Sequence, residues 1–174
     1  MKKQRGITLV ESCVTLAVAA IVAAGAVPSM EQLLDARRLD GAASQLLSDL
    51  QFTRISAMAR NQRIRFSLQA DAMGSCYVIH TGSADACRCG ESGPAICENA
   101  ASEIRTVRLP LSDRVLVKAN VASILFDPVH GTSTPTGTVR VIGSNGREVR
   151  QIVNVMGRVR TCSPQGNVGG YRAC

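Results

Sequence analysis

The fold of this 174-residue chain is decided at its start, which reads Met1-Lys2-Lys3-Gln4-Arg5-Gly6-Ile7-Thr8-Leu9-Val10-Glu11. Three positive charges precede an apolar run that continues to Val27, and no charged residue occurs from Ser12 to Met30. At about 1.5 Å per residue, a helix of some 20 residues spans the ~30 Å hydrocarbon core of a bilayer. The basic residues ahead of the run predict a cytoplasmic N-terminus.

Glu11 is the charged residue inside this apolar run. A carboxylate in a membrane-spanning segment is costly unless it is paired or neutralised. Either Glu11 reaches the headgroups from a marginal helix end, or it pairs with a cation on another subunit. The residue alone does not distinguish these alternatives.

Two processing routes fit the segment. An ordinary secretory signal would be cut near Ala24-Gly25-Ala26, and the apolar run would be lost. Glu11 is a poor residue for the core of such a signal. The second route cuts after Gly6 and retains the apolar run as a helix.

The run from Lys2 to Glu11 resembles the signature of type IV prepilins. The resemblance implies that a prepilin peptidase removes residues 1–6 as a leader and methylates Ile7, although Phe is the usual residue at that place. Residues 7–28 then form the transmembrane and filament-core helix. In pilins the glutamate at the fifth mature position, here Glu11, neutralises a neighbour's N-terminal amine, and Pro28 matches a proline common at mature position 22.

The pattern after Pro28 is typical of an amphipathic helix. Apolar residues recur at mostly three- and four-residue spacing, at Leu39, Ala43, Leu46, Leu50 and Ala57. We therefore expect one helix from Ile7 to Asn61, bent near Pro28.

Short β-prone runs separated by turn signals follow the helix. They are Ile64–Leu68, Cys76–Thr81, Ile104–Leu109, Arg114–Lys118, Ser123–Asp127, Thr138–Ile142, Val149–Val155 and Arg158–Cys162. Asn145-Gly146 predicts a tight hairpin turn. The expected fold is α+β and type IV pilin-like, with residues 29–174 as a periplasmic or extracellular globular domain built on an antiparallel sheet.

The C-terminal part resembles a narrower family. Ile124-Leu125-Phe126-Asp127-Pro128, a hairpin, and then Val155-Met156-Gly157-Arg158-Val159-Arg160 resemble the GspH/FimT family of minor pilins and pseudopilins. The resemblance covers both ends of the chain, whereas residues 74–102 resemble no family.

Seven cysteines favour an oxidising compartment. Cys13 is expected to be a small hydrophobe in the apolar run, and a Cys162–Cys174 disulfide is predicted to close a C-terminal loop. Four more cysteines lie in one loop-rich stretch, at Cys76, Cys87, Cys89 and Cys97. Cys87 and Cys89 are too close in sequence to pair well. A zinc site is disfavoured because paired Cys-x₂-Cys spacing is absent, so neither metal nor cofactor is expected.

The net charge of +7 is unevenly distributed. The leader carries three cations, and residues 29–136 balance 11 basic against 11 acidic groups. Residues 137–174 contain one acid, Glu148, and six arginines: Arg140, Arg147, Arg150, Arg158, Arg160 and Arg172. The guanidinium group of arginine is a planar fork that matches phosphate oxygens.

These arginines suggest a cradle for a phosphate backbone. Arg158 and Arg160 share one face of a strand, Arg147 and Arg150 are able to join them from the preceding hairpin, and the C-terminal loop holds Arg172 nearby. Scattered arginines on a solvated strand are the commoner arrangement in an average protein.

A family motif favours the phosphate cradle. FimT-type minor pilins of naturally competent bacteria contain a Gly-Arg-x-Arg motif implicated in DNA binding, and Gly157-Arg158-Val159-Arg160 matches it. The resemblance implies phosphate contacts with double-stranded DNA during uptake.

Catalysis is not expected. The sequence contains no Gly-x-Ser-x-Gly, phosphate-loop or His-Glu-x-x-His motif. Asp127 and His130 flank a proline turn, and Asp127 is expected to cap that turn.

Two functions remain from the sequence. The first is a minor pilin that presents the C-terminal arginines to DNA. The alternative is a type II secretion pseudopilin, pseudopilin H, with a structural or cargo-contacting role and no DNA binding. Both imply an inner-membrane, single-pass subunit that assembles with other pilins or pseudopilins into a periplasmic or surface filament.

Overall fold

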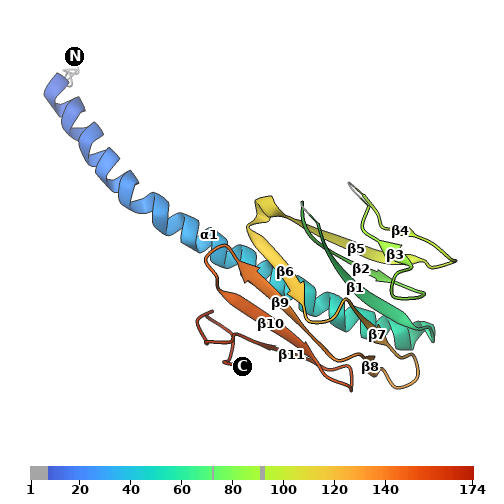
Figure 1. Ribbon diagram of the computed structural model, residues 1–174. Helices are drawn as coiled ribbons and strands as arrows, with labels where there is room; N and C mark the ends of the chain where they lie inside the picture. The colour runs from blue at the N-terminus through green and yellow to red at the C-terminus, as the bar shows by residue number, and fades with distance from the viewer. Residues whose placement is uncertain (1–7, 72, 91–92) are drawn as a thin grey trace, which may run out of the picture. The chain divides into compact units, whose positions relative to one another are not determined.

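The computed structural model describes residues 8–71, 73–90 and 93–174, except for the side chains of residues 26–29. A long helix, α1, runs from Leu9 to Arg60 (Figure 1). The chain divides into two compact units, Met1–Leu34 and Asp35–Cys174, and α1 contributes to both. The expected helix from Ile7 to Asn61 is therefore present with ends shifted by one or two residues.

The first unit is an apolar helical segment. Thr8 caps its start, since the Thr8 Oγ1 accepts a hydrogen bond of 3.3 Å from the Glu11 backbone N–H. Leu9 and Ile21 are 81% and 74% exposed, and an 18-residue window reaches a mean hydropathy of 2.1. By length and composition this segment is able to cross a membrane.

In the second unit α1 presents one apolar stripe to the core. The stripe is the one that the sequence predicts, and its members are at most 1% exposed: Leu39, Ala43, Leu46, Leu50 and Ala57. The helix ends because Asn61 adopts φ 48°, while the Gln62 N–H donates to the Ala57 carbonyl. This left-handed end is a common C-terminal cap, which asparagine tolerates well.

Two antiparallel sheets pack with this helix (Figure 1). The five-stranded sheet has the order β5-β2-β1-β7-β8, and the four-stranded sheet has the order β11-β10-β9-β6. Their strands are β1 (Ile64–Asp71), β2 (Gly74–His80), β5 (Glu103–Pro110), β6 (Val115–Ala119), β7 (Ser123–Phe126), β8 (Ser133–Thr134), β9 (Gly137–Gly143), β10 (Glu148–Val153) and β11 (Val159–Cys162). A 3-10 turn, Leu111–Asp113, joins β5 to β6.

The core lies between the helix and the inner faces of both sheets. The rings of Phe66 and Tyr77 contact each other at a tilt of 32°, with centroids 4.9 Å apart, and both residues are 1% exposed. All of the core residues fall within 39–168. A fragment that begins at residue 29 therefore retains the whole core and all of the compact unit Asp35–Cys174, and we expect it to fold on its own.

A buried carboxylate fastens α1 to the five-stranded sheet. Asp49 is 1% exposed, accepts a 2.6 Å hydrogen bond from the Tyr77 hydroxyl and pairs with Arg105. Burial raises the pKa of Tyr77, and the bond to Asp49 raises it further. The Arg105 guanidinium carbon also lies 4.8 Å from the centroid of the Phe52 ring. This network gives the buried polar groups at the helix–sheet contact their hydrogen-bond and ion-pair partners.

The stretch without a family resemblance forms a small disulfide-bonded lobe around β3 (Cys87–Arg88) and β4 (Ile96–Cys97). Two disulfides, Cys76–Cys89 and Cys87–Cys97, hold it. Cys76, Val78 and Cys87 form its own buried cluster. Because the lobe covers the second face of β2, all seven residues of that strand are buried.

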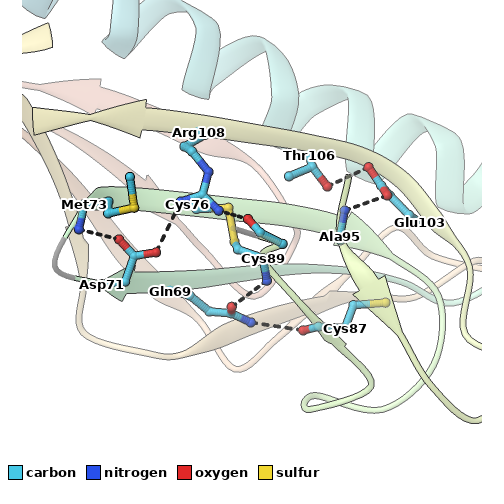
Figure 2. Close-up of a disulfide and its surroundings, with 11 residues drawn as sticks. Gln69, Asp71, Met73, Cys76, Cys87, Cys89, Ala95, Glu103, Thr106 and Arg108 are labelled. Carbon is cyan, nitrogen blue, oxygen red and sulfur yellow. Dashed lines mark hydrogen bonds and ion pairs between the residues drawn. A yellow bond between two sulfur atoms is a disulfide. The ribbon is translucent and has the colours of Figure 1, made fainter. Parts of the chain in front are cut away.

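Side chains of the five-stranded sheet fix the lobe (Figure 2). Gln69 donates to the Cys87 carbonyl at 3.0 Å and accepts from the Cys89 N–H at 2.9 Å. Arg108 bonds the Gly90 carbonyl, and the Glu103 carboxylate accepts from the Ala95 N–H at 2.8 Å. The lobe is therefore held by polar contacts as well as by disulfides.

The architecture confirms the predicted α+β, pilin-like fold. Each of the eight predicted strands is present. The sequence did not predict the two-residue strands β3, β4 and β8, and the strands form two main sheets rather than the single sheet expected.

Candidate nucleic-acid interface

The predicted Gly-Arg-x-Arg motif begins in the turn between β10 and β11. Gly157 adopts φ 69° and its N–H donates to the Asn154 carbonyl at 2.8 Å. The Asn154 side chain accepts a 3.0 Å hydrogen bond from the Arg158 N–H. The turn is thus closed by asparagine and glycine, which leaves the two arginines at its exit and on β11.

Position 157 requires glycine for a steric reason. A Cβ atom there would lie 2.1 Å from the Gly131 carbonyl oxygen and 2.9 Å from the Arg54 Nε. Arg54 on α1 donates from Nε to that same carbonyl at 2.9 Å. Ser133 also holds the turn, donating from its N–H to the Val155 carbonyl at 2.9 Å and from Oγ to the Asn154 carbonyl at 2.6 Å.

Arg158 and Arg160 are both exposed. Arg160 lies opposite Ile152 of β10 and donates to the Cys174 oxygen at 3.4 Å. Arg158 lines a cleft of about 360 Å³ beside α1, together with Arg54 and Ile55. The motif therefore presents one arginine beside the helix and one beside the C-terminal loop.

The remaining predicted arginines lie further along the same hairpin. Arg150 is opposite Cys162, and its Nε pairs with Glu148 at 2.6 Å. Arg147 follows the turn between β9 and β10, which antiparallel pairing places at the opposite end of β10 from Arg158. The set thus forms a band along the hairpin, and the structure does not bring Arg147 beside Arg158.

The C-terminal loop is tied to the free edge of β11. Cys162 and Cys174 form a disulfide, and the Ser163 N–H donates to the Arg172 carbonyl at 2.8 Å. The Tyr171 hydroxyl also donates to Asp40 of α1 at 2.5 Å. These contacts hold the exposed Arg172 beside β11, as a further member of the band.

Two cations outside the predicted set extend the basic surface. Lys118 on β6 lies opposite Arg140 on β9, and Arg140 lies opposite Arg150 on β10. Composition indicated Arg140 as part of the C-terminal excess, but Lys118 belongs to the neutral part of the chain. Only the strand register reveals that these residues are neighbours.

The other chemical candidates have structural roles. The Asp127 carboxylate accepts hydrogen bonds from the Val129 and His130 N–H groups at 3.0 and 3.1 Å, and these bonds lower the pKa of Asp127. This is the capped turn that the sequence predicts. Within the described ranges, no group of three or more His, Cys, Asp or Glu residues is arranged to hold a metal ion.

The prepilin positions are only partly described. Gly6 and Ile7 lie outside the described residues. Glu11 lies in the first turn of α1, and the helix continues through the position of Pro28. The bend expected near Pro28 stays a prediction, because the side chains of residues 26–29 are outside the described part of the chain.

Comparison with a solved minor pilin supports the fold. The type IV minor pilin FimU of Pseudomonas aeruginosa is 20% identical and covers 72% of this chain and 97% of its own, with a TM-score of 0.53. The minor pseudopilin EpsH of the type 2 secretion system of Vibrio cholerae is 13% identical over 73% of this chain and 98% of its own, with a TM-score of 0.49. Among curated proteins none matches the sequence.

Two family matches cover most of the chain. The prokaryotic N-terminal methylation motif matches residues 1–27, and the family described as type II transport protein GspH matches residues 42–157. Because the second match spans more than half of the chain, the chain belongs to the GspH family, as a minor pilin or pseudopilin of the type IV pilus or type II secretion class.

Proposed function

We propose that this minor pilin binds double-stranded DNA through phosphate contacts made by the C-terminal band of arginines, as part of DNA uptake. The band consists of Arg147, Arg150, Arg158, Arg160 and Arg172, with Gly157 shaping the turn. The observation that carries the proposal is that four members of this band are exposed on one hairpin and its C-terminal loop: Arg147, Arg158, Arg160 and Arg172.

The ion pairs of the structure support this choice. Arg105, Arg108 and Arg114 of the preceding part each pair with an aspartate. Within the described ranges, Arg150 is the one member of the band that pairs with a carboxylate. The other members keep their charge available for a polyanion.

DNA binding by the fragment 29–174 across salt concentrations tests the proposal. If about four phosphates are contacted, the logarithm of the association constant should fall against that of salt with a slope of roughly −3.6. Arg158→Gln/Arg160→Gln should flatten this slope by about 1.8, because two contacts are lost. The effect should be alike for all DNA sequences, since phosphate contacts carry no base information.

A matched variant distinguishes binding at the arginine band from a general effect of the protein's net charge. Arg37 on α1 and Arg88 on β3 are exposed, so Arg37→Gln/Arg88→Gln removes the same charge elsewhere. Equal losses in both double variants would assign binding to net charge alone. Absence of binding by the folded, oxidised fragment at low salt would refute the DNA function.

We further propose the assembly route implied by the N-terminus. A prepilin peptidase cleaves after Gly6 and methylates Ile7, and residues 7–28 anchor the chain in the inner membrane with a cytoplasmic N-terminus. Glu11 then neutralises the free amine of a neighbouring subunit in the filament, because a buried charge is tolerable when paired. Intact mass should show a chain that begins at Ile7 with one added methyl group; a chain that begins after Ala26 would refute this route.

The alternative is a secretion pseudopilin with a structural or cargo-contacting role. The family match, whose description names type II transport, favours it. In that case the arginines contact acidic neighbours or cargo, and the fragment does not bind DNA. The salt titration therefore decides between the two functions.

A further inference from the structure

The outer face of the four-stranded sheet carries a row of cations that crosses its strands. Lys118, Arg140 and Arg150 occupy directly opposed positions on β6, β9 and β10. Their neighbours along each strand point inward: Val139 and Val141, on either side of Arg140, are both fully buried. Strand alternation therefore places the three cations on one outward face.

This row is unfavourable for the free protein. Like charges directly opposite each other destabilise a sheet, and here two such pairs share Arg140. Glu148 offsets the charge of Arg150 through the 2.6 Å pair. Within the described residues, neither Lys118 nor Arg140 pairs with a carboxylate, so the repulsion between them is not compensated inside the chain.

The same two cations line an open groove. The groove measures about 460 Å³, and no aspartate or glutamate lies among the described residues around it. Asn120 at its wall is already engaged, since its side-chain oxygen accepts from the Thr138 N–H at 2.7 Å. The groove thus offers two cations and no competing carboxylate to an anion.

We propose that Lys118 and Arg140 form a second phosphate-binding strip, which leads the DNA backbone from Arg160 over Arg150 and across the four-stranded sheet. This proposal rests on the proposed function. From β11 to β6 there are three strand spacings, about 14 Å, so one stretch of DNA backbone is long enough to reach the motif and the strip together. Phosphate binding also relieves the repulsion between the two cations.

The test is DNA binding by the fragment 29–174 with Lys118→Gln/Arg140→Gln, beside the Arg37→Gln/Arg88→Gln control. The salt slope should become less steep by about 1.8 in the strip variant, so that affinity changes about 12-fold less between roughly 50 and 200 mM salt. The control should keep a slope close to that of the unaltered fragment. Arg140→Lys should retain binding because the charge remains.

Thermal unfolding without DNA gives an independent readout. Because the strip variant removes repulsion, its melting temperature should equal or exceed that of the unaltered fragment. A lower melting temperature together with an unchanged salt slope would assign both residues to folding and overturn the proposal.

The outcomes also separate this inference from the proposed function. If Arg158→Gln/Arg160→Gln weakens binding and Lys118→Gln/Arg140→Gln behaves like the control, the proposed strip is refuted and the motif remains the DNA site. If the unaltered fragment binds no DNA, both the strip and the proposed DNA function are refuted.

Discussion

Replacing Gly157 by alanine tests why the Gly-Arg-x-Arg motif begins with glycine. Two penalties add at this position: φ is 69°, and a Cβ would lie 2.1 Å from the Gly131 carbonyl oxygen. The left-handed conformation costs about 1–2 kcal/mol for a residue with a side chain. Forcing an extra methyl group into a packed site adds about 1–3 kcal/mol.

Gly146 is the matched control. It adopts φ 75° in the β9–β10 turn, and a Cβ there would meet no atom within 4 Å. Gly146→Ala should therefore lose only the conformational part, about 1–2 kcal/mol. The difference between the two variants isolates the contact with Gly131.

Guanidinium unfolding of the oxidised fragment 29–174 measures this difference. With a denaturant slope of about 4 kcal/mol per molar, a difference of ~2 kcal/mol shifts the midpoint by roughly 0.5 M between the two variants. Gly157→Ala should also weaken DNA binding, because it displaces the turn from Arg54 and moves Arg158. Equal midpoints for Gly157→Ala and Gly146→Ala would refute the packing of this turn against Gly131.

Three other variants probe the second unit. Asp49→Asn should lower the free energy of unfolding by about 2 kcal/mol, because it removes a buried charged acceptor, and an unchanged denaturation midpoint would contradict that role. Cys162→Ser/Cys174→Ser should cost about 3 kcal/mol by freeing a 12-residue loop in the unfolded chain, measured in the same way under oxidising conditions. Burial lowers the pKa of His80 below its value of 6.5 in the unfolded chain. The free energy of unfolding should therefore be unaffected by this histidine above pH 6.5 and should fall as the pH drops below 6.5, because the unfolded chain then binds the proton more readily. His80→Gln should flatten this loss, whereas the exposed His130→Gln should leave it in place.

The helix and strands that the sequence predicted are those whose apolar residues recur at a regular local spacing. The stripe from Leu39 to Ala57 and the alternation in β9 and β10 are visible within a few residues, because one face of each element is buried. β3, β4 and β8 are two residues long, which is too short for any period. The complete burial of β2 was also beyond prediction, since it depends on a lobe formed by a later part of the chain.

The candidate arginine site was likewise predictable only in part from the sequence. Composition located the arginine excess, and the motif located its turn. The reason for Gly157 lies at Gly131 and Arg54, 26 and 103 positions earlier in the sequence, and no local pattern connects them. Likewise, six cysteines outside the apolar run allow fifteen pairings, so Cys76–Cys89 and Cys87–Cys97 required the folded chain.

Which arginines remain unpaired matters more to the interface than their number. Of the six described arginines that pair with a carboxylate, five precede residue 137: Arg38, Arg88, Arg105, Arg108 and Arg114. Three cations without an aspartate or glutamate partner among the described residues, Lys118, Arg140 and Arg160, lie on β6, β9 and β11 of the four-stranded sheet. Neighbours in this group are one or two strand spacings apart, about 5–10 Å across the strands. Because the screening length at physiological salt is about 8 Å, such neighbours act on an approaching polyanion as one continuous field. A ligand that spans several of them gains from each contact, whereas a single phosphate gains from one. If the proposed function holds, the surface should therefore bind long polyanions such as DNA more tightly than mononucleotides.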